Sequence, residues 1–330
     1  MNLNLDACIS YLSIILFNTY NSVELIAGVD EVGRGPLAGP VIACAVILST
    51  EHSIKGLKDS KKLSKKKREE LFPIIQDQAI SVGLGVSDVK TIDKYNIREA
   101  TFMAMKNALE NLDPKPTRAL IDGEPLRNIS IPNKGIIGGD NLIDSIKAAS
   151  IIAKVTRDNI MKEYAKIFYE YGFENNSGYG TKIHMEALKK YKATPIHRKS
   201  FKPVANALPS MNWVIENNRI SWLGNKLAAL YLRKLNFKNI EIVEKHPISK
   251  RIDIVCMRHN IPHYINVFTS HNKIEERIKR NILNSTLETF TESNASKDFN
   301  NSKQKEHKFG QIFVELQKGG PLILYNDNII

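Results

Sequence analysis

The chain has 330 residues, 42% of them hydrophobic and 25% charged, which is the composition of an ordinary soluble globular protein with room for two domains. A formal net charge of +12 favours nucleic acid, an anionic membrane surface or another acidic partner. The three cysteines, Cys8, Cys44 and Cys256, are odd in number and far apart, which argues against a disulfide framework and a structural zinc site and makes the reducing cytoplasm the expected location.

Residues 1–23 are expected to form an N-terminal extension, either a leader that packs on the domain or a start-site extension, and no function is assigned to it. Ala7–Phe17 is apolar, but Asp6 precedes it, no lysine or arginine forms a basic leader, and no small-residue cleavage site follows cleanly. The apolar run is also too short to span a bilayer, so no membrane association is expected.

Short apolar runs rich in β-branched residues predict five strands in the first half of the chain. These strands are Ile26–Asp30, Pro40–Leu48, Ala79–Val86, Ala119–Asp122 and Gly135–Ile137. Apolar residues at three- and four-residue spacing predict helices over Ile97–Leu112 and Asn141–Phe168, the latter as one long helix or two in succession. A block of strands followed by helices is typical of an α/β domain with a mixed sheet.

The composition changes after Pro203, and we place a domain boundary near residue 208. A helix is predicted over Trp213–Leu235. Further strands are predicted over Ile240–Val243, Ile252–Met257, Tyr264–Phe268, Gln311–Leu316 and Leu322–Tyr325. Ser285–Lys305 is rich in Ser, Asn, Thr and Lys, which predicts a flexible loop.

Four acids follow apolar strands or glycine turns in the first domain. Asp30 and Glu31 end the first predicted strand, Asp122 ends the fourth, and Asp140 follows two glycines at the start of the long helix. Carboxylates in such places are costly unless they are paired or bound to a cation, and Mg²⁺ or Mn²⁺ suits an all-oxygen ligand set. Taken singly, Asp30 as a strand end, Asp122 as a turn residue and Asp140 as a helix cap remain open alternatives.

Several motifs, in order along the chain, resemble those of bacterial type 2 ribonuclease H, the ribonuclease HII family. The motifs are Gly28–Pro40 (GVDEVGRGPLAGP), Asp59–Leu63 (DSKKL), Ile121–Gly123 (IDG), Gly139-Asp140, Ala148–Asp158 (AASIIAKVTRD), Tyr171–Thr181 (YGFENNSGYGT) and His197–Pro203 (HRKSFKP). The resemblance covers about residues 24–206. Several motifs in register are far more specific than any one of them.

The resemblance implies a ribonuclease-H-like fold, with a five-stranded mixed sheet, flanking helices and a helical extension, over residues 24–208. It implies an endonuclease that uses two divalent cations, Mn²⁺ or Mg²⁺, to hydrolyse the RNA strand of RNA–DNA hybrids and ribonucleotides embedded in duplex DNA, leaving 5′-phosphate and 3′-hydroxyl ends, with a role in DNA replication and repair. The catalytic, metal-binding acids that it implies are Asp30, Glu31, Asp122 and Asp140.

The resemblance also implies substrate contacts. The turn formed by Gly33, Arg34 and Gly35 would contact the ribonucleotide, and Tyr179 would lie against the RNA–DNA junction. Glycines let a backbone approach a 2′-hydroxyl closely, and the 2′-hydroxyl is what distinguishes RNA from DNA.

Other polar residues of these motifs receive weaker interpretations. Lys61 and Lys62 are expected to contact phosphate, with a solvated charge run from Lys61 to Arg68 as the alternative. A pair on a helix surface is one interpretation of Arg157 and Asp158. His184 and His197 are expected at the surface or against phosphate, without a catalytic role.

Residues 209–330 resemble the YraN-like family, a small α/β fold similar to that of restriction endonucleases. The similar stretches are Gly224–Leu232, Lys250–Val255, Tyr264–Phe268 and Lys308–Phe313. Where that family has acids and a lysine, this chain has Lys226, Arg251, Asn266 and Phe268, and only Asp253 remains.

One carboxylate is too few for a nuclease site, so we expect this domain to be catalytically inactive. Its cations are expected to add affinity for nucleic acid: Lys226, Lys250, Arg251, Arg277, Lys279 and Arg280. A chain ending near residue 208 should then still cleave. A protein-docking module or a remnant is an alternative role for this domain, and the sequence indicates no particular protein partner.

Two further functions compete with the two-metal ribonuclease. A nucleic-acid-binding protein without catalysis would use the net charge of +12 and keep the acids as strand ends. Another phosphoryl-transfer enzyme, such as a DNA nuclease or an integrase-like recombinase, would share the acids. The Gly33–Gly35 turn together with Tyr179 disfavours the latter, because it indicates recognition of a 2′-hydroxyl.

Overall fold

The computed structural model describes residues 24–243, 252–295, 307–317 and 319–327. The chain divides into two compact units, and each is described by itself. The first contains the described residues up to Arg34 together with Pro40–Arg157, and the second contains Gly35–Gly39 and the described residues from Asp158 onward. The predicted N-terminal extension, residues 1–23, lies outside the described residues.

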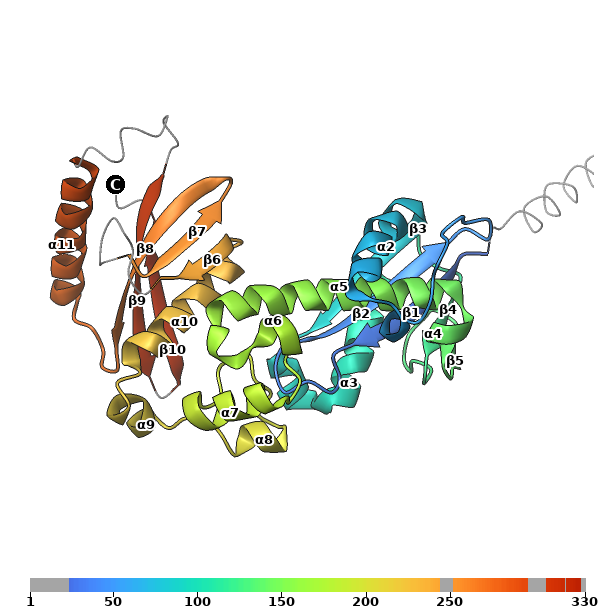
Figure 1. The fold of residues 1–330 in the computed structure, drawn as a ribbon, viewed down its shortest axis with the longest axis horizontal. Coiled ribbons are helices and arrows are strands. Elements are labelled where there is room, and N and C mark those ends of the chain that lie inside the picture. Colours follow the sequence, from blue (N-terminus) through green and yellow to red (C-terminus); the bar gives the residue numbers. More distant parts are fainter. Residues whose placement is uncertain (1–23, 244–251, 296–306, 318, 328–330) are drawn as a thin grey trace, which may run out of the picture. The chain divides into compact units, whose positions relative to one another are not determined.

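The first unit contains a mixed five-stranded sheet, as the sequence predicted (Figure 1). Its strands are β1 (Ile26–Val32), β2 (Val41–Leu48), β3 (Ala79–Ser87), β4 (Arg118–Asp122) and β5 (Asn133–Ile136), in the order β3-β2-β1-β4-β5. The pairs β1–β2 and β2–β3 are antiparallel, whereas β1–β4 and β4–β5 are parallel. All five predicted strands of this half are therefore confirmed, within two residues at their ends.

Helices cover both faces of this sheet. They are α2 (Lys65–Gln78), α3 (Val89–Glu110), α4 (Gly139–Leu142) and α5 (Asp144–Ile167). A Cβ on Gly83 would lie 2.1 Å from a carbonyl oxygen of α3, and one on Gly28 would lie 2.3 Å from the backbone of α5. Gly83 pairs with Ala45, whereas Gly28 pairs with the next residue, Val46. Because successive strand residues face opposite sides, α3 and α5 pack on opposite faces.

The predicted helices are confirmed with shifted ends. Helix α3 begins at Val89, where Asp88 caps it by accepting a hydrogen bond from the Thr91 amide, and a non-helical Asn96 (φ 66°) breaks it. The segment predicted as Asn141–Phe168 forms two helices, α4 and α5, separated by the extended residue Ile143.

The second unit contains helices followed by a second mixed five-stranded sheet. The helices are the last part of α5, α6 (Phe173–Asn176), α7 (Lys182–Tyr191), α8 (Lys202–Ala205), α9 (Met211–Glu216), α10 (Ile220–Lys234) and α11 (Glu276–Ala295). The strands are β6 (Lys238–Ile242), β7 (Ile254–Arg258), β8 (Ile261–Ser270), β9 (Lys308–Gln317) and β10 (Gly320–Asn326), in the order β10-β9-β8-β7-β6. All five strands overlap the predicted ones.

One hydrophobic core runs through the second unit. It joins Phe168 and Phe173, from the segment that resembles ribonuclease HII, to Leu232 on α10 and to Ile254 and Ile312 in the sheet. This core spans the position of the domain boundary predicted near residue 208, and the boundary itself stays a prediction.

The flexible loop predicted over Ser285–Lys305 is wrong over its first part. Helix α11 continues to Ala295, and residues 296–306 lie outside the described residues. Strands β8 and β9 are parallel, and parallel neighbours need a long crossover connection, usually a helix. The polar composition that predicted a loop is that of a crossover helix. Within the described residues, no helix is long and apolar enough to cross a membrane.

Candidate functional site

Asp30 and Asp122 occupy matching positions on neighbouring parallel strands. Val29 pairs with Ile121, so the next residues of β1 and β4, Asp30 and Asp122, share the face that α5 covers. Asp30 is only 5% exposed. Asp140, also 5% exposed, follows β5 as the second residue of α4. Three of the predicted acids are thus carried by adjacent elements of one unit.

Hydrogen bonds fix the orientation of these carboxylates. One Asp30 oxygen accepts from the Glu31 amide at 2.7 Å, and the carboxylate also accepts from the Ser150 hydroxyl on α5. Asp122 Oδ1 accepts from the Gly139 amide at 2.8 Å, which ties the end of β4 to the start of α4. The donors leave part of each carboxylate available to another ligand.

The acids act on one another electrostatically. Burial raises the pKa of Asp30 well above its usual range, and the charges of Glu31 and Asp122 raise it further. Burial also raises the pKa of Asp122, with a contribution from Asp140, and the pKa of Glu31 is raised chiefly by burial, against the opposing effect of Arg34. Four buried or half-buried acids therefore repel one another in this region.

Cations lie at the rim of the acid group. Lys61 Nζ is 3.6 Å from Asp140 Oδ2, and the Lys62 ammonium donates to the side chain of Asn141, the next residue. The Arg34 guanidinium is 3.8 Å from a Glu31 oxygen. Lys61 and Arg34 are both more than half exposed, so a phosphate could replace the carboxylate partner of either cation.

The donor chemistry of the acids fits a hard divalent cation. In the part of the chain that the structure describes, no three Asp, Glu, His or Cys side chains already converge as a ligand cluster. The electrostatic coupling among Asp30, Glu31, Asp122 and Asp140 nevertheless favours a cation, because added positive charge would relieve both burial and repulsion. All four donors are oxygens, the ligands that Mg²⁺ and Mn²⁺ prefer.

The glycine turn after β1 rests on a buried arginine. Gly33 has φ 96°, and a Cβ there would lie 2.2 Å from Arg157 Nε, so only glycine fits. Arg157 is fully buried, and its Nε donates to the Pro40 carbonyl at 2.9 Å. The helix-surface pair suggested for Arg157 and Asp158 is therefore wrong: Arg157 supports the turn, and Asp158 accepts a hydrogen bond from Ser177.

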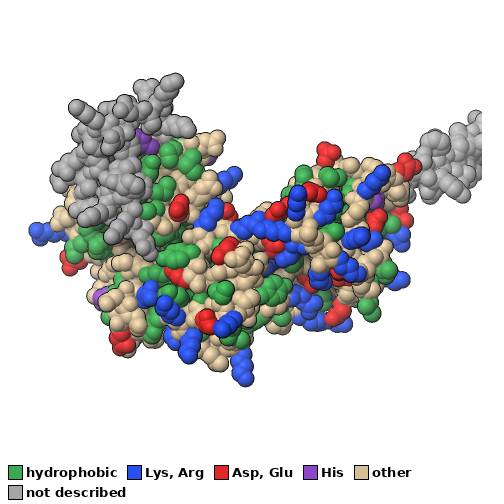
Figure 2. All heavy atoms as spheres, viewed as in Figure 1, with side chains coloured by type: hydrophobic (Ala, Val, Ile, Leu, Met, Phe, Trp, Pro, Cys, Tyr) green, Lys and Arg blue, Asp and Glu red, His purple; other side chains and the backbone are tan. Residues whose placement is uncertain are grey.

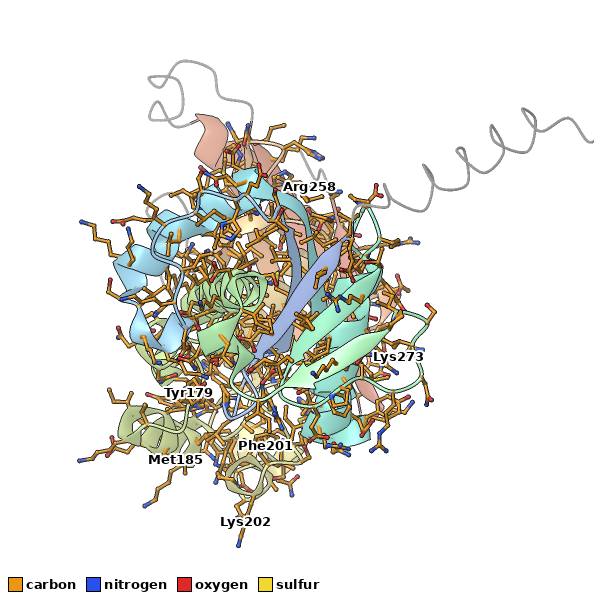
Figure 3. All side chains as sticks on the ribbon, turned by 90° about the vertical axis from the view of Figure 1, so that its right-hand side faces the viewer. Tyr179, Met185, Phe201, Lys202, Arg258 and Lys273 are labelled. Atoms are coloured by element: carbon orange, nitrogen blue, oxygen red, sulfur yellow. The ribbon has the colours of Figure 1, made fainter. Side chains whose placement is uncertain are left out.

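Gly35 and Tyr179, predicted separately as substrate contacts, lie together in the second unit. A Cβ on Gly35 would be 3.5 Å from the Tyr179 ring, and the Leu37 amide donates to the Gly178 carbonyl at 2.8 Å. Tyr179 is 44% exposed, and its position can be seen in Figure 3. An exposed aromatic ring beside glycine backbone is suited to packing on a sugar.

The second unit also presents exposed lysine side chains on and beside α7 and α8. Figure 2 shows Lys and Arg side chains projecting over α7 and α8, and the exposed lysines of this segment are Lys182, Lys189, Lys190, Lys199 and Lys202. Such a surface suits a polyanion.

His184 and His197 are not at the surface, contrary to the sequence expectation. Both are buried, at 0% and 1% exposure, and their Nε2 atoms are 2.9 Å apart. His184 also bonds the Tyr179 carbonyl through Nδ1, at 2.9 Å. The signal was present in the spacing, because His184 shares its helix face with buried Ala187 and Leu188, three and four residues on.

Asp253, the residue before β7, lies in a network of neutral polar groups. Asp253 Oδ2 accepts from the Val267 amide at 2.8 Å and from Asn266 Nδ2 at 3.1 Å, while Asn266 Oδ1 accepts from Gln311. Burial raises the pKa of Asp253 to about 6. The groups bonded to Asp253 and to Asn266 in this network are therefore neutral.

Two of the cations expected to bind nucleic acid are already paired. Lys226 is 1% exposed and bonds Glu170, so its predicted phosphate contact is wrong. Lys279 pairs with Glu276 and Glu315. Lys250 and Arg251 lie outside the described residues.

Comparisons with known proteins cover the first part of the chain. A model of the family described as ribonuclease HII matches residues 27–204, more than half of the chain. Among solved structures, ribonuclease H2 of Pyrococcus horikoshii OT3 is 28% identical with a TM-score of 0.49, over 55% of this chain and 96% of that one. Ribonuclease HII of Archaeoglobus fulgidus, solved in a complex with PCNA, is 25% identical with a TM-score of 0.46, over 54% of this chain and 95% of that one. Bst ribonuclease HIII, solved with Mn²⁺, is 20% identical with a TM-score of 0.46, over 57% of this chain and 70% of that one.

Proposed function

Because the chain belongs to the ribonuclease HII family, we propose that it is an endoribonuclease that hydrolyses the RNA strand of RNA–DNA hybrids and ribonucleotides embedded in duplex DNA. The observation that carries the proposal is the matching placement of Asp30 and Asp122 on parallel strands, where burial and neighbouring acids raise the pKa of both. A structural strand end gains nothing from such a costly arrangement.

Asp30, Glu31, Asp122 and Asp140 would hold two divalent cations, Mn²⁺ or Mg²⁺. When bound, such cations activate a water and stabilise the charge that develops on the scissile phosphate, leaving a 5′-phosphate and a 3′-hydroxyl. The protein's own part is to orient the carboxylates. Ser150 does this for Asp30, and the Gly139 amide does it for Asp122.

Substrate recognition is assigned to groups between Glu31 and Asp122 in sequence and to one residue beyond Asp140. Lys61 and Lys62 would contact phosphate, and the backbone of Gly33, Arg34 and Gly35 would meet the 2′-hydroxyl. Buried Arg157 keeps Gly33 in place for this contact. Tyr179 would pack on the sugar at the RNA–DNA junction, which its exposed ring allows.

We further infer that residues 209–330 form a YraN-like, restriction-endonuclease-like domain that follows a catalytic domain of residues 24–208 and performs no cleavage. Asp253 is held by the Val267 amide and by the side chains of Asn266 and Asn225, which are all neutral donors. The inference is tested by assaying the parent and Asp253→Asn on the same substrates.

The test of the main proposal uses three duplexes: all DNA, DNA with one ribonucleotide, and an RNA–DNA hybrid. With Mn²⁺ or Mg²⁺, the parent should cut the last two only. Asp30→Asn and Asp122→Asn should fold but lose cleavage by at least about a hundredfold, because an amide is a poor cation ligand. Asp77→Asn, an exposed acid on α2, is the matched control and should cleave normally.

Three outcomes would contradict the proposal. Near-parental cleavage by either acid variant would overturn the metal assignment, and cutting of all-DNA duplex would indicate a DNA nuclease. Binding of all three duplexes without cleavage would indicate a nucleic-acid-binding protein.

The ends are identified by radiolabelling the product strands: a 5′-phosphate blocks labelling by polynucleotide kinase until a phosphatase removes it.

A further inference from the structure

Lys226 lies on α10, beyond the residues that match the family, and is buried. Its Nζ is 3.0 Å from Glu170 Oε1 and 3.1 Å from Oε2, and it also donates to the Ile167 carbonyl. Lysine is seldom buried unless it is paired, and the pairing with Glu170 makes the burial of Lys226 possible. The ammonium group also lies 4.4 to 5.7 Å from the ring centroids of Tyr169, Phe168 and Trp222.

Glu170 is held from the same helix by a second donor. Trp222 Nε1 donates to Glu170 Oε1 at 2.6 Å. Glu170 lies in the short 3₁₀ turn Tyr169–Tyr171, inside the family-matching residues. Helix α10 packs on β8 of the C-terminal sheet. Lys226 and Trp222, both on α10, thus bind the Glu170 carboxylate, which belongs to the family-matching segment.

Asn176 connects the Tyr169–Tyr171 turn to the backbone of Tyr179. Asn176 Nδ2 donates to the Tyr171 carbonyl at 2.7 Å, and Asn176 Oδ1 accepts from the Gly178 amide at 2.8 Å. The Tyr179 amide donates to the Asn176 carbonyl at 2.9 Å. Asn176 is therefore hydrogen-bonded both to Tyr171, the residue after Glu170, and to the amide of Tyr179.

A second route reaches the Tyr179 carbonyl. The Tyr171 ring packs against His197, with centroids 5.0 Å apart, and against His184, at 6.0 Å. His184 donates from Nδ1 to the Tyr179 carbonyl. Both polar backbone groups of Tyr179 are therefore bonded to residues that the Tyr169–Tyr171 turn supports.

We propose that Lys226 is a positioning residue for Tyr179, and that holding the substrate-contacting tyrosine in place is a function of the C-terminal domain. The buried Lys226–Glu170 ion pair holds the Tyr169–Tyr171 turn in position. This turn holds Asn176 and His184, which bond the backbone of Tyr179. The functional part of this statement rests on the proposed ribonuclease activity, whereas the mechanical part does not.

The mechanical part is tested by amide hydrogen exchange. Lys226→Met alone would leave Glu170 buried without its partner and could fail to fold, so it is combined with Glu170→Gln, which removes both charges. In this double variant, we expect the Gly178 and Tyr179 amides to exchange at least about tenfold faster, while amides of β1 keep the parental rates. Lys234→Met, an exposed lysine on the same helix, should leave all these rates unchanged.

The functional part is tested by substrate choice. The measured quantity is the ratio of cleavage at one embedded ribonucleotide to cleavage within a long hybrid. The Lys226→Met/Glu170→Gln variant should shift this ratio in the same direction as Tyr179→Ala, and adding Tyr179→Ala to it should shift the ratio little further.

The two measurements test the mechanical part and the functional part of the proposal separately. Parental exchange at Gly178 and Tyr179 in the double variant overturns the proposal. So does faster exchange with an unchanged cleavage ratio, in a parent whose ratio responds to Tyr179→Ala. If the parent cuts no ribonucleotide-containing duplex, the proposed function fails, and hydrogen exchange alone still decides whether Lys226 positions Tyr179.

Discussion

The Nε2 atoms of His184 and His197 lie 2.9 Å apart in the interior of the second unit, and their other hydrogen bonds define both tautomers. His197 Nδ1 accepts from the Thr194 amide, so the proton of His197 is on Nε2, which donates to His184. His184 Nδ1 then carries its proton toward the Tyr179 carbonyl. Both rings must be neutral, because a second proton on either would place two donors face to face.

The pair predicts a loss of stability in mild acid. Burial lowers the pKa of both imidazoles below the usual 6.5, and for His197 well below it. The unfolded chain therefore binds more protons than the folded one in mild acid. The contribution of the neutral histidine pair to the free energy of unfolding is complete above about pH 6.5 and is lost as pH falls toward the folded-state pKa values. The loss is about 1.4 kcal/mol for each unit of lowered pKa.

Urea denaturation between pH 8 and pH 5 measures this loss. His197→Gln should be less stable than the parent at pH 8 but should lose less of its stability on acidification. His271→Gln, an exposed histidine, should follow the parental curve. Parallel curves for the parent and His197→Gln would rule out the neutral pair as the cause.

Asp30→Asn should stabilise the protein in the absence of metal. Burial and the charges of Glu31 and Asp122 make the ionised Asp30 unfavourable, and a nearly isosteric amide removes that charge. Mn²⁺ should then make the parent more stable than Asp30→Asn. Thermal unfolding in a chelator should favour the variant, and millimolar Mn²⁺ should raise the midpoint of the parent more than that of Asp30→Asn. An equal rise in both proteins would contradict a cation held by Asp30.

Tyr179→Ala should reduce cleavage at a single embedded ribonucleotide by about tenfold or more, and cleavage within a long hybrid less. An RNA–DNA junction is present at every single ribonucleotide, whereas a long hybrid offers many bonds far from one, and each stacked contact contributes roughly 1–3 kcal/mol. Rates on the two substrates are compared with those of Tyr95→Ala, an exposed tyrosine on α3. A uniform loss on both substrates would argue against a junction role.

The sequence predicted the sheet of the first unit because its strands are short apolar runs bounded by glycines, as at Gly33 and Gly123. It also predicted that Asp30 and Asp122 lie together, since both follow strands of one sheet. It did not predict what depends on distant partners. Arg157 lies at the polar end of the Ala148–Asp158 motif, and the close approach of Gly33 explains its burial. Lys226 has the residue type of a phosphate contact, and its partner Glu170 is far away in sequence.

Asp253→Asn should leave cleavage unchanged and should stabilise the fold above pH 6. Burial raises the pKa of this carboxyl from 3.8 to about 6, so ionisation at higher pH opposes folding, by about 3 kcal/mol, and the amide avoids that cost. Denaturation at pH 8 and pH 5 should show a gain at pH 8 that shrinks at pH 5. A large fall in cleavage at either pH would show that the second sheet takes part in chemistry.

A chain ending at residue 208 should be strongly destabilised, which revises the expectation that it would still cleave. The core around Phe168 and Phe173 includes Leu232, Ile254 and Ile312, so truncation removes the covering of a ribonuclease segment. Each large apolar side chain left exposed forfeits about 1.5–3 kcal/mol, and a few such losses equal the whole stability of a typical domain. The truncated chain should bind an apolar dye, melt at lower temperature and lose protection at Tyr179. A shorter deletion, ending at residue 327, is the control, since it leaves every described residue of the core in place. Parental melting and cleavage by the 208-residue chain would show that the two parts fold independently and would refute the shared core as a source of stability.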